Sequence, residues 1–369
     1  MIKKLFKLIA INIVVFIGLL ITVNLLVILI FQGHKIINKE IADTRGNLPN
    51  YKNIDWAHKH FKEFKELPTE YRSYIGWRRL SYKGETININ EQGIRNTSQS
   101  PLATEKSPLV VFLGGSTMWG TGVNDANTIP SLFAKVAQGR YRAMNLGEAA
   151  YNAFQGYVFL KLQIINGLNP YVVVSYDGVN DAQVLMPDRR PFSHNRENQI
   201  RKAMEGKDRI KDETLSFNHF LLNPLKSFIA KCKVYYTKNH TYKISQNNAE
   251  QKAKVLLDSW LCAKELAETH GAYFVAVLQP NAAIGKPYLK HLKLSEKEIS
   301  IYKLFYPVVL ELLKTPKYQE LHRHVLVLTD VFDSEENIYV DAVHVSPKGN
   351  KIIAEKIYNH INNSIHRVK

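Results

Sequence analysis

An apolar run that stops abruptly at two glycines and a serine constrains the fold of this 369-residue chain more than any other feature. The segment reads Leu109-Val-Val-Phe-Leu-Gly-Gly-Ser-Thr-Met-Trp-Gly120. Its β-branched part predicts a buried strand, and the small residues that follow predict a tight turn into a helix. In open α/β folds, ligands bind at the carboxyl edge of the sheet, where such a turn would place the Ser116 hydroxyl.

Apolar runs and helical patterns alternate from Pro108 to the end of the chain. Strands are expected near 109–113, 141–146, 171–176, 272–278 and 325–331. Helices are expected near 128–138, 153–167, 251–270, 295–314 and 347–363. Repeated strand–helix–strand units favour a parallel sheet covered on both faces. The sequence therefore predicts the α/β class, a three-layer sandwich with a five-stranded parallel sheet.

Residues 184–250 interrupt this alternation, with a basic first half and an apolar patch, Phe217-Asn-His-Phe-Leu-Leu-Asn-Pro-Leu, in the second. An insertion after a ligand-binding edge suits a cap that selects substrate. A solvated surface excursion fits the charged half equally well. Both interpretations stay open.

The N-terminus predicts a membrane anchor. The segment from Leu8 to Phe31 contains no charged residue, and it is long enough to span a bilayer core of about 30 Å. A buried core helix is the alternative interpretation. Residues 1–7 would form a short cytoplasmic tail, and 32–107 a stalk that leads into a main domain at 108–363. Lys and Arg flank the span almost equally, so orientation depends on the short tail staying inside. We expect a single-pass protein whose membrane-lipid contact is this helix and whose main domain lies outside the cytoplasm, in the periplasm or extracellular space.

Aromatic residues are dense between Tyr51 and Arg79, where packing onto the main domain is favoured over an amphipathic surface at the membrane. His58 and His60 have no further ligands nearby, so they are expected to be solvated rather than metal-bound. No metal site and no cofactor are predicted. The net charge of +16 favours an anionic partner, but no nucleic-acid-binding motif is present, and nucleic acid is not expected.

Three polar segments follow the predicted first strand in order: Asn145-Leu-Gly147, Gly178-Val-Asn-Asp181 and Asp341-Ala-Val-His344. A serine becomes a nucleophile when a neighbouring base takes its proton and a carboxylate orients that base. Ser116, His344 and Asp341 could fill these roles, because the sheet can return distant segments to one edge.

Acyl transfer also needs hydrogen-bond donors for the developing oxyanion. The backbone N–H groups of Ser116 and Gly147 and the side-chain amide of Asn180 are the candidates. Gly115 and Gly178 are expected beside the substrate, because a residue without a Cβ lets a ligand approach the backbone.

This order of blocks resembles the SGNH (GDSL-type) hydrolase superfamily, and within it the membrane-anchored, polysaccharide-linked branch. Gly-Gly-Ser-Thr at 114–117, Asn145-Leu-Gly147, Gly178-x-Asn-Asp181 and Asp341-x-x-His344 match four blocks over residues 108 to 363. One departure is Gly115, where many members carry Asp. The resemblance implies a flavodoxin-like sheet and an enzyme that cleaves or transfers esters through an acyl-serine intermediate.

Three functions are compatible with these sequence features. The anchor and basic charge favour an esterase or acyltransferase acting on O-acetyl groups of a surface carbohydrate, so an ester-bearing, acylated carbohydrate is the expected substrate. The anchor and the apolar patch would also suit a lipolytic esterase at the bilayer. A catalytically silent envelope scaffold or glycan-binding protein is the third possibility, and the intact set of polar residues counts against it.

Overall fold

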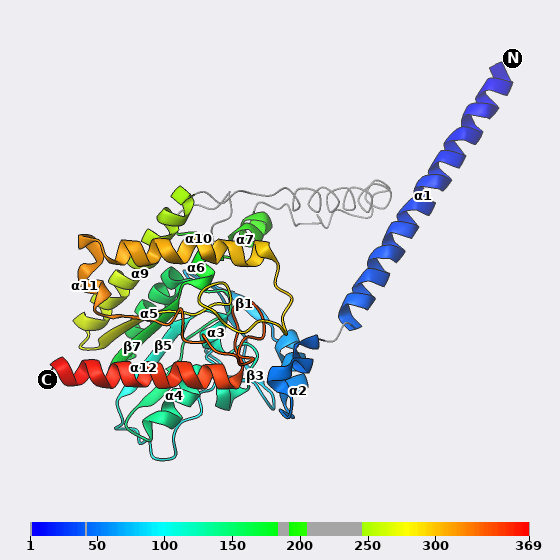
Figure 1. Ribbon diagram of the computed structural model, residues 1–369. Coiled ribbons are helices and arrows are strands. Elements are labelled where there is room, and N and C mark those ends of the chain that lie inside the picture. The colour runs from blue at the N-terminus through cyan, green and yellow to red at the C-terminus, as the bar shows by residue number, and fades with distance from the viewer. Residues whose placement is uncertain (1, 41–42, 184–191, 205–245, 369) are drawn as a thin grey trace. The chain divides into compact units, whose positions relative to one another are not determined.

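The computed structural model describes residues 2–40, 43–183, 192–204 and 246–368 (Figure 1). The chain divides into two compact units. One consists of residues 1–42 and 199–243 and contains the N-terminal helix α1 (Ile2–Glu40). The other consists of residues 43–198 and 244–369 and contains the sheet. The domain boundaries expected from the sequence remain a prediction.

Five parallel strands form the central sheet. In spatial order they are β6 (Arg142–Asn145), β5 (Leu109–Gly114), β7 (Val172–Asp177), β8 (Tyr273–Leu278) and β9 (Val325–Val327). If the five strands are numbered as they occur along the chain, their spatial order in the sheet is 2-1-3-4-5. The direction in which successive strands are added therefore reverses between β5 and β7. This is the flavodoxin-like arrangement, whose ligands bind at the carboxyl ends of the strands beside the reversal. The predicted fold class is confirmed.

Helices cover both faces of the sheet (Figure 1). Because successive side chains of a strand point to opposite faces, Val111 and Leu113 enter one core while Val110 and Phe112 enter the other. The first core is closed by α5 (Ala153–Ile165), α9 (Gln246–Thr269) and α10 (Glu296–Leu313). The second is closed by α4 (Ile129–Ala137) and α12 (Pro347–Val368). Every expected strand and helix has its counterpart, with α9 starting earlier than expected and β9 shorter.

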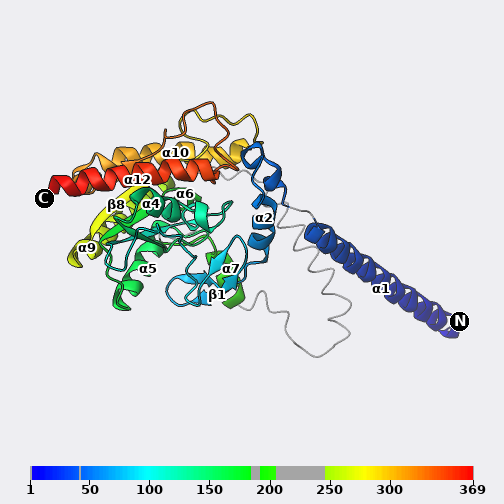
Figure 2. The ribbon, with the colours of Figure 1, turned by 90° about the horizontal axis from the view of Figure 1, so that it is seen from below.

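Residues 43–107 lie in the same unit as the sheet. Their elements are η1 (Thr44–Asn47), η2 (Pro49–Tyr51), α2 (Ala57–Glu66), β1 (Thr69–Arg72), β2 (Gly76–Arg79), β3 (Tyr82–Lys83) and β4 (Asn88–Ile89). Phe61 and Trp77 are buried, which confirms the predicted aromatic packing, whereas Tyr71 and Tyr74 are exposed. In both ribbon views, α2 lies at the opposite end of the unit from the C-terminus of α12 (Figure 1 and Figure 2).

The expectation that His60 is solvated was wrong. The ring is fully buried, and its Nε2 accepts a hydrogen bond from the Gly122 N–H at 3.1 Å. Burial, together with the positive charges of Arg95 and Arg45, lowers the pKa of His60 well below its ordinary value. A neutral histidine therefore joins α2 to the chain beyond β5.

The remaining described elements are short: α3 (Ser116–Trp119), η3 (Asp125–Asn127), α6 (Val179–Gln183), α7 (Glu197–Met204), η4 (Pro316–Tyr318) and α11 (Gln319–His322). Most of the insertion at 184–250 lies outside the described residues, and so does its apolar patch. Its predicted role as a cap stays a prediction.

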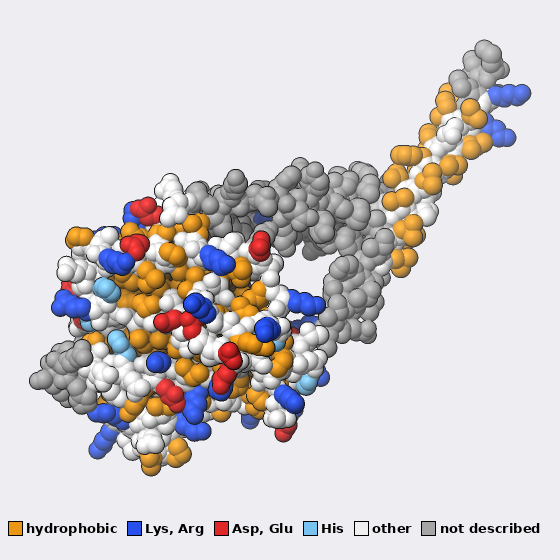
Figure 3. Space-filling model, in the orientation of Figure 1, with side chains coloured by type: hydrophobic (Ala, Val, Ile, Leu, Met, Phe, Trp, Pro, Cys, Tyr) orange, Lys and Arg blue, Asp and Glu red, His pale blue; other side chains and the backbone are white. Residues whose placement is uncertain are grey.

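Helix α1 is long and apolar enough to cross a membrane between Phe6 and Leu26. On the face seen in Figure 3, hydrophobic side chains predominate over the middle part of α1. Its polar side chains bond within the helix, since Asn12, Thr22 and Asn24 each donate to the carbonyl four residues before. Polar groups satisfied in this way are tolerated in an apolar environment.

Candidate active site

The serine turn joins β5 to the one-turn helix α3, which begins at Ser116. Both preceding glycines are required by close packing. Gly114 has φ +151°, and a Cβ there would lie 2.6 Å from the Tyr176 carbonyl oxygen. A Cβ on Gly115 would come closer than 3.0 Å to Asn180 Nδ2, a separation that real Cβ atoms essentially never show. The glycine pair therefore lets the end of β5 pass against β7 and α6.

Ser116, His344 and Asp341 form a continuous hydrogen-bonded chain. The His344 Nε2 atom lies 2.8 Å from Ser116 Oγ. Its Nδ1 atom lies 2.7 Å from Asp341 Oδ2 and 3.0 Å from Oδ1. When the Nδ1–H donates to the carboxylate, Nε2 carries a lone pair that can accept the serine proton. The three residues are separated by up to 228 positions in the sequence and meet at one edge of the sheet.

The loop that carries Asp341 and His344 is closed by its own backbone. Tyr339 and Val345 form an antiparallel bridge, and the Val340 N–H donates to the His344 carbonyl at 2.9 Å. The backbone N–H groups of Val343 and His344 donate to Asp341 Oδ1 at 2.9 and 2.8 Å. Burial opposes ionisation of Asp341, but the His344 charge and these hydrogen bonds outweigh it and hold the pKa of the carboxyl well below its usual range.

Residues 43–51, the first of the sheet-containing unit, pack and bond against this loop, and we call these contacts the clasp. Arg45 Nη1 lies 3.6 Å from Asp341 Oδ2, and the Asn50 side-chain amide donates to the Asn337 carbonyl at 2.6 Å. Val340 packs in a small apolar cluster with Tyr51. The contact of Arg45 with Asp341 could not be predicted, because nothing in the local sequence marks a contact with a residue almost 300 positions later.

The candidate oxyanion donors lie around Ser116 but differ in their present partners. Ser116 is the first residue of α3, a position whose N–H has no acceptor within the helix. One amide hydrogen of Asn180 donates to the Tyr151 carbonyl at 2.7 Å, which leaves its second hydrogen. The Gly147 N–H already donates to Asn145 Oδ1 at 3.0 Å. Gly147 would therefore have to share its proton with an oxyanion.

Gly178 has φ +124°, and a Cβ there would lie 2.9 Å from the Tyr306 hydroxyl. Tyr306 comes from α10 and donates to the Gln279 carbonyl at 3.0 Å. The space beside Gly178 is thus filled by protein, which gives this glycine a packing role apart from any contact with substrate.

Two buried carboxyl groups lie beneath Asn180. Asp181 accepts from the Ala153 and Gly178 N–H groups at 3.1 Å each. Asp177 accepts from Trp260 Nε1 at 2.9 Å. Burial, and then the neighbouring charge of Asp177, raise the pKa of Asp181 to about 7. Asp181 therefore ties the Asn180 turn to the start of α5, and Asp177 ties the end of β7 to α9.

Within the described ranges, no group of three or more His, Cys, Asp or Glu side chains is arranged to hold a metal ion.

No protein-family model and no curated protein sequence matches this chain. Solved structures similar to it are consistently esterases, lipases and acylhydrolases. A GDSL-like lipase from Bacteroides thetaiotaomicron is 14% identical, with 72% of this chain and 92% of that chain covered and a TM-score of 0.37. A carbohydrate acetylesterase family member from Sinorhizobium meliloti is 11% identical, with 69% and 97% covered and a TM-score of 0.38.

The psychrotrophic esterase EstA from Pseudoalteromonas sp. is 11% identical, with 70% of this chain and 98% of that chain covered and a TM-score of 0.37. The GDSL-like lipase carries in its description the name of the superfamily that the sequence blocks resemble.

Proposed function

We propose that this chain is a serine esterase or acyltransferase that works through an acyl-serine intermediate. The observation that carries the proposal is the hydrogen-bonded chain from Ser116 Oγ through His344 to Asp341, with contacts of 2.8 and 2.7 Å. A hydroxyl, a base and an orienting carboxylate at these distances are the parts that nucleophilic acyl transfer needs.

In the first half-reaction, Ser116 Oγ attacks the ester carbonyl carbon while its proton passes to His344 Nε2. The ionised Asp341 stabilises the imidazolium. Negative charge develops on the former carbonyl oxygen, where the Ser116 N–H, the free Asn180 amide hydrogen and the shared Gly147 N–H would donate. The tetrahedral intermediate then collapses, the bond to the alcohol breaks, and His344 returns the proton to the leaving alcohol oxygen.

In the second half-reaction, the O–H of water or of an acceptor attacks the carbonyl carbon of the acyl-serine and gives its proton to His344 Nε2. The bond to Ser116 Oγ then breaks, and His344 returns the proton to Oγ. Water as the nucleophile gives hydrolysis, and a sugar hydroxyl gives acyl transfer. We propose an O-acetylated surface carbohydrate as the substrate. The net charge of +16 favours anionic envelope material, and a lipid ester is the second candidate because α1 can cross a membrane.

We further propose that α1 is a single-pass anchor with the sheet-containing unit outside the cytoplasm. The support is the length of the apolar stretch and the internal hydrogen bonds of its polar side chains. Lys3, Lys4 and Lys7 before the stretch are nearly balanced by Lys35, Lys39 and Arg45 after it, so the orientation is proposed because a long following domain can translocate regardless of flanking charge.

A fluorophosphonate tests the nucleophile without knowledge of the natural substrate. The full-length protein in detergent should be labelled on Ser116, as located by peptide mass spectrometry. Ser116→Ala and His344→Ala should lose labelling, whereas Ser73→Ala, which changes an exposed serine, should keep it. Labelling of a folded Ser116→Ala protein would rule out the assignment. Acetylated glycans and lipid esters, with released acyl groups identified, then separate the two substrate classes.

A further inference from the structure

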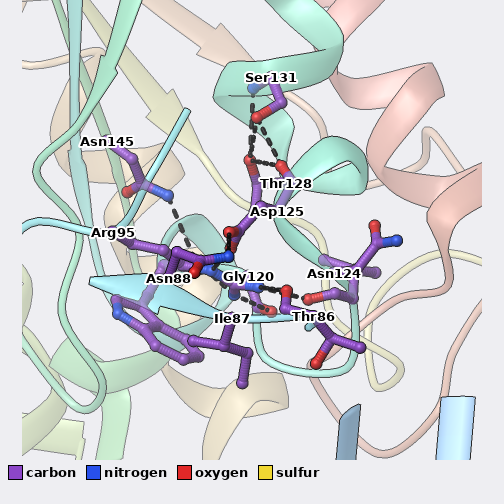
Figure 4. A network of polar contacts seen from close by, with 12 residues as sticks. Thr86, Ile87, Asn88, Arg95, Gly120, Asn124, Asp125, Thr128, Ser131 and Asn145 are labelled. Carbon is purple, nitrogen blue, oxygen red and sulfur yellow. Dashed lines mark hydrogen bonds and ion pairs between the residues drawn. The ribbon is translucent and has the colours of Figure 1, made fainter. Parts of the chain in front are cut away.

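Arg95 is a fully buried arginine that donates to the chain immediately after the serine turn. Its Nη1 lies 2.7 Å from the Gly120 carbonyl oxygen and 3.1 Å from that of Trp119. Its Nη2 lies 2.6 Å from the Val123 carbonyl oxygen, and its Nε lies 2.9 Å from Asp125 Oδ1. Figure 4 shows this network, with Arg95 directed at Asp125 and Gly120.

The carbonyl and carboxylate oxygens around Arg95 explain why its charged guanidinium can be buried. The last carbonyls of a helix have no partner within it, and α3 is a single turn that ends at Trp119. Arginine presents five donors in a rigid fork, so one side chain can bind three carbonyls and a carboxylate together. Asp125 supplies the opposite charge that a buried guanidinium requires. The Trp119 ring lies 4.4 Å from the Arg95 guanidinium carbon, which adds a cation–π contact.

A second clamp holds the other side of the same turn. The Asn145 side-chain amide donates to the Met118 and Trp119 carbonyls at 3.1 and 3.2 Å, while its oxygen accepts from the Gly147 N–H. Arg95 and Asn145 are also paired across an antiparallel bridge. The serine turn and the Gly147 segment are therefore fixed to one another through these two side chains.

We infer that Arg95 is a positioning residue for the Ser116 nucleophile. It holds the C-terminal end of α3, and because α3 has one turn, this fixes the direction of the hydroxyl at its N-terminal end. Arg95 touches neither substrate nor reacting atoms. The inference rests on the proposed function, in which Ser116 attacks the ester.

The test compares Arg95→Lys and Arg95→Met with Arg142→Met in the full-length protein. Arg142 is also bonded to a carbonyl, that of Ser107 at 3.1 Å, but it lies at the start of β6, away from the carboxyl edge. The rate of fluorophosphonate labelling and the kcat and KM for a small acetate ester are measured beside the melting temperature. A misplacement near 1 Å costs about 10²-fold, so labelling and kcat should fall about 10- to 100-fold in Arg95→Met, with KM nearly unchanged. Arg95→Lys should recover part of this loss, and Arg142→Met should behave as wild type.

Loss of Arg95 also leaves the Asp125 carboxylate without its ion pair, although the Asn88 side-chain amide still donates to Oδ2 at 3.0 Å. The double variant Arg95→Met/Asp125→Asn therefore separates stability from positioning. We expect this double variant to regain part of the melting temperature, because the unpaired charge is gone while the carbonyls that Arg95 bound stay unsatisfied, but not to regain the labelling rate. A folded double variant that labels at the wild-type rate would overturn the inference and leave the proposed function intact. A wild-type protein that is not labelled on Ser116 would instead overturn the proposed function.

Discussion

A single methyl group at position 115 should disable the proposed oxyanion hole. In the structure, the space that a Cβ on Gly115 would occupy is taken by Asn180 Nδ2, with the Tyr151 carbonyl oxygen at 3.1 Å on another side. The Asn180 amide already binds that carbonyl oxygen at 2.7 Å. Gly115→Ala must therefore push the amide away from the serine turn.

The expected magnitude follows from the geometry. Ordinary contacts begin at 3.4 Å, so the amide nitrogen has to retreat by about 1 Å, a misplacement that costs about 10²-fold in rate. Removing one oxyanion donor altogether costs about 10²–10³-fold, or roughly 2.7–4 kcal/mol of transition-state stabilisation. Gly115→Ala should thus lower kcat by about 10²-fold, while KM changes little because the effect arises in the transition state.

The assay is hydrolysis of a small acetate ester by the wild type, Gly115→Ala, Asn180→Ala and the double variant. Because the methyl acts through the amide, the double variant should be little slower than Asn180→Ala alone. Gly156→Ala is the matched control: its Cβ would meet only Leu113 Cβ at 3.6 Å, and its activity should be unchanged. Full activity in Gly115→Ala, or losses that multiply in the double variant, would refute the reasoning.

Three further predictions can be checked separately. Asp341→Asn should lower kcat by about 10²–10⁴-fold in the same assay, because the amide cannot stabilise the imidazolium; a loss under threefold would contradict the triad. Asp181 has its pKa raised from 3.8 to about 7, so the folded state keeps a proton that the unfolded state loses, and this group's contribution to stability falls as pH rises from about 4 to 7. In thermal melts between pH 4 and 7, the decrease of melting temperature with pH should be smaller in Asp181→Asn than in the wild type. An unchanged pH dependence would exclude Asp181 as its source. Removing residues 1–31 should release the protein from the membrane fraction after cell fractionation, whereas intact protein recovered as soluble would end the anchor hypothesis.

The strands and helices of the sheet-containing unit could be predicted because their signals are local. A parallel strand buried on both faces is a continuous apolar run, and Leu109–Gly114 and Tyr273–Leu278 both have this pattern. Strand β9 is shorter than the run at 325–331 predicts, because it is an edge strand that pairs with β8 only over Val325–Val327. His344 could be predicted as the base because a nucleophilic serine needs one, and because Asp341, three residues earlier, can orient its ring.

The supports of the site could not be predicted, because their partners are distant in the sequence. Arg95 looks like any surface arginine after a turn, and only the fold brings Trp119 and Gly120 against it. The close approach of Asn180 to Gly115 could not be predicted either. The sequence shows that position 115 has no side chain, but it does not show which neighbouring side chain occupies that space. His60 was misjudged for the same reason: a buried acceptor and a solvated ring have the same local pattern.

The clasp between residues 43–51 and the His344 loop has a consequence for the order of folding. Asn50 bonds to the Asn337 and Tyr339 carbonyls, contacts that span 287 and 289 positions, and Arg45 reaches Asp341 across a similar stretch. Contacts of such high sequence separation form late, because chain entropy must be lost before they contribute. An intermediate with a complete sheet but an undocked leading segment would hold the serine turn without a supported base. Enzymatic activity should therefore appear after the spectroscopic signals of helix and sheet, and it would report the last step of folding.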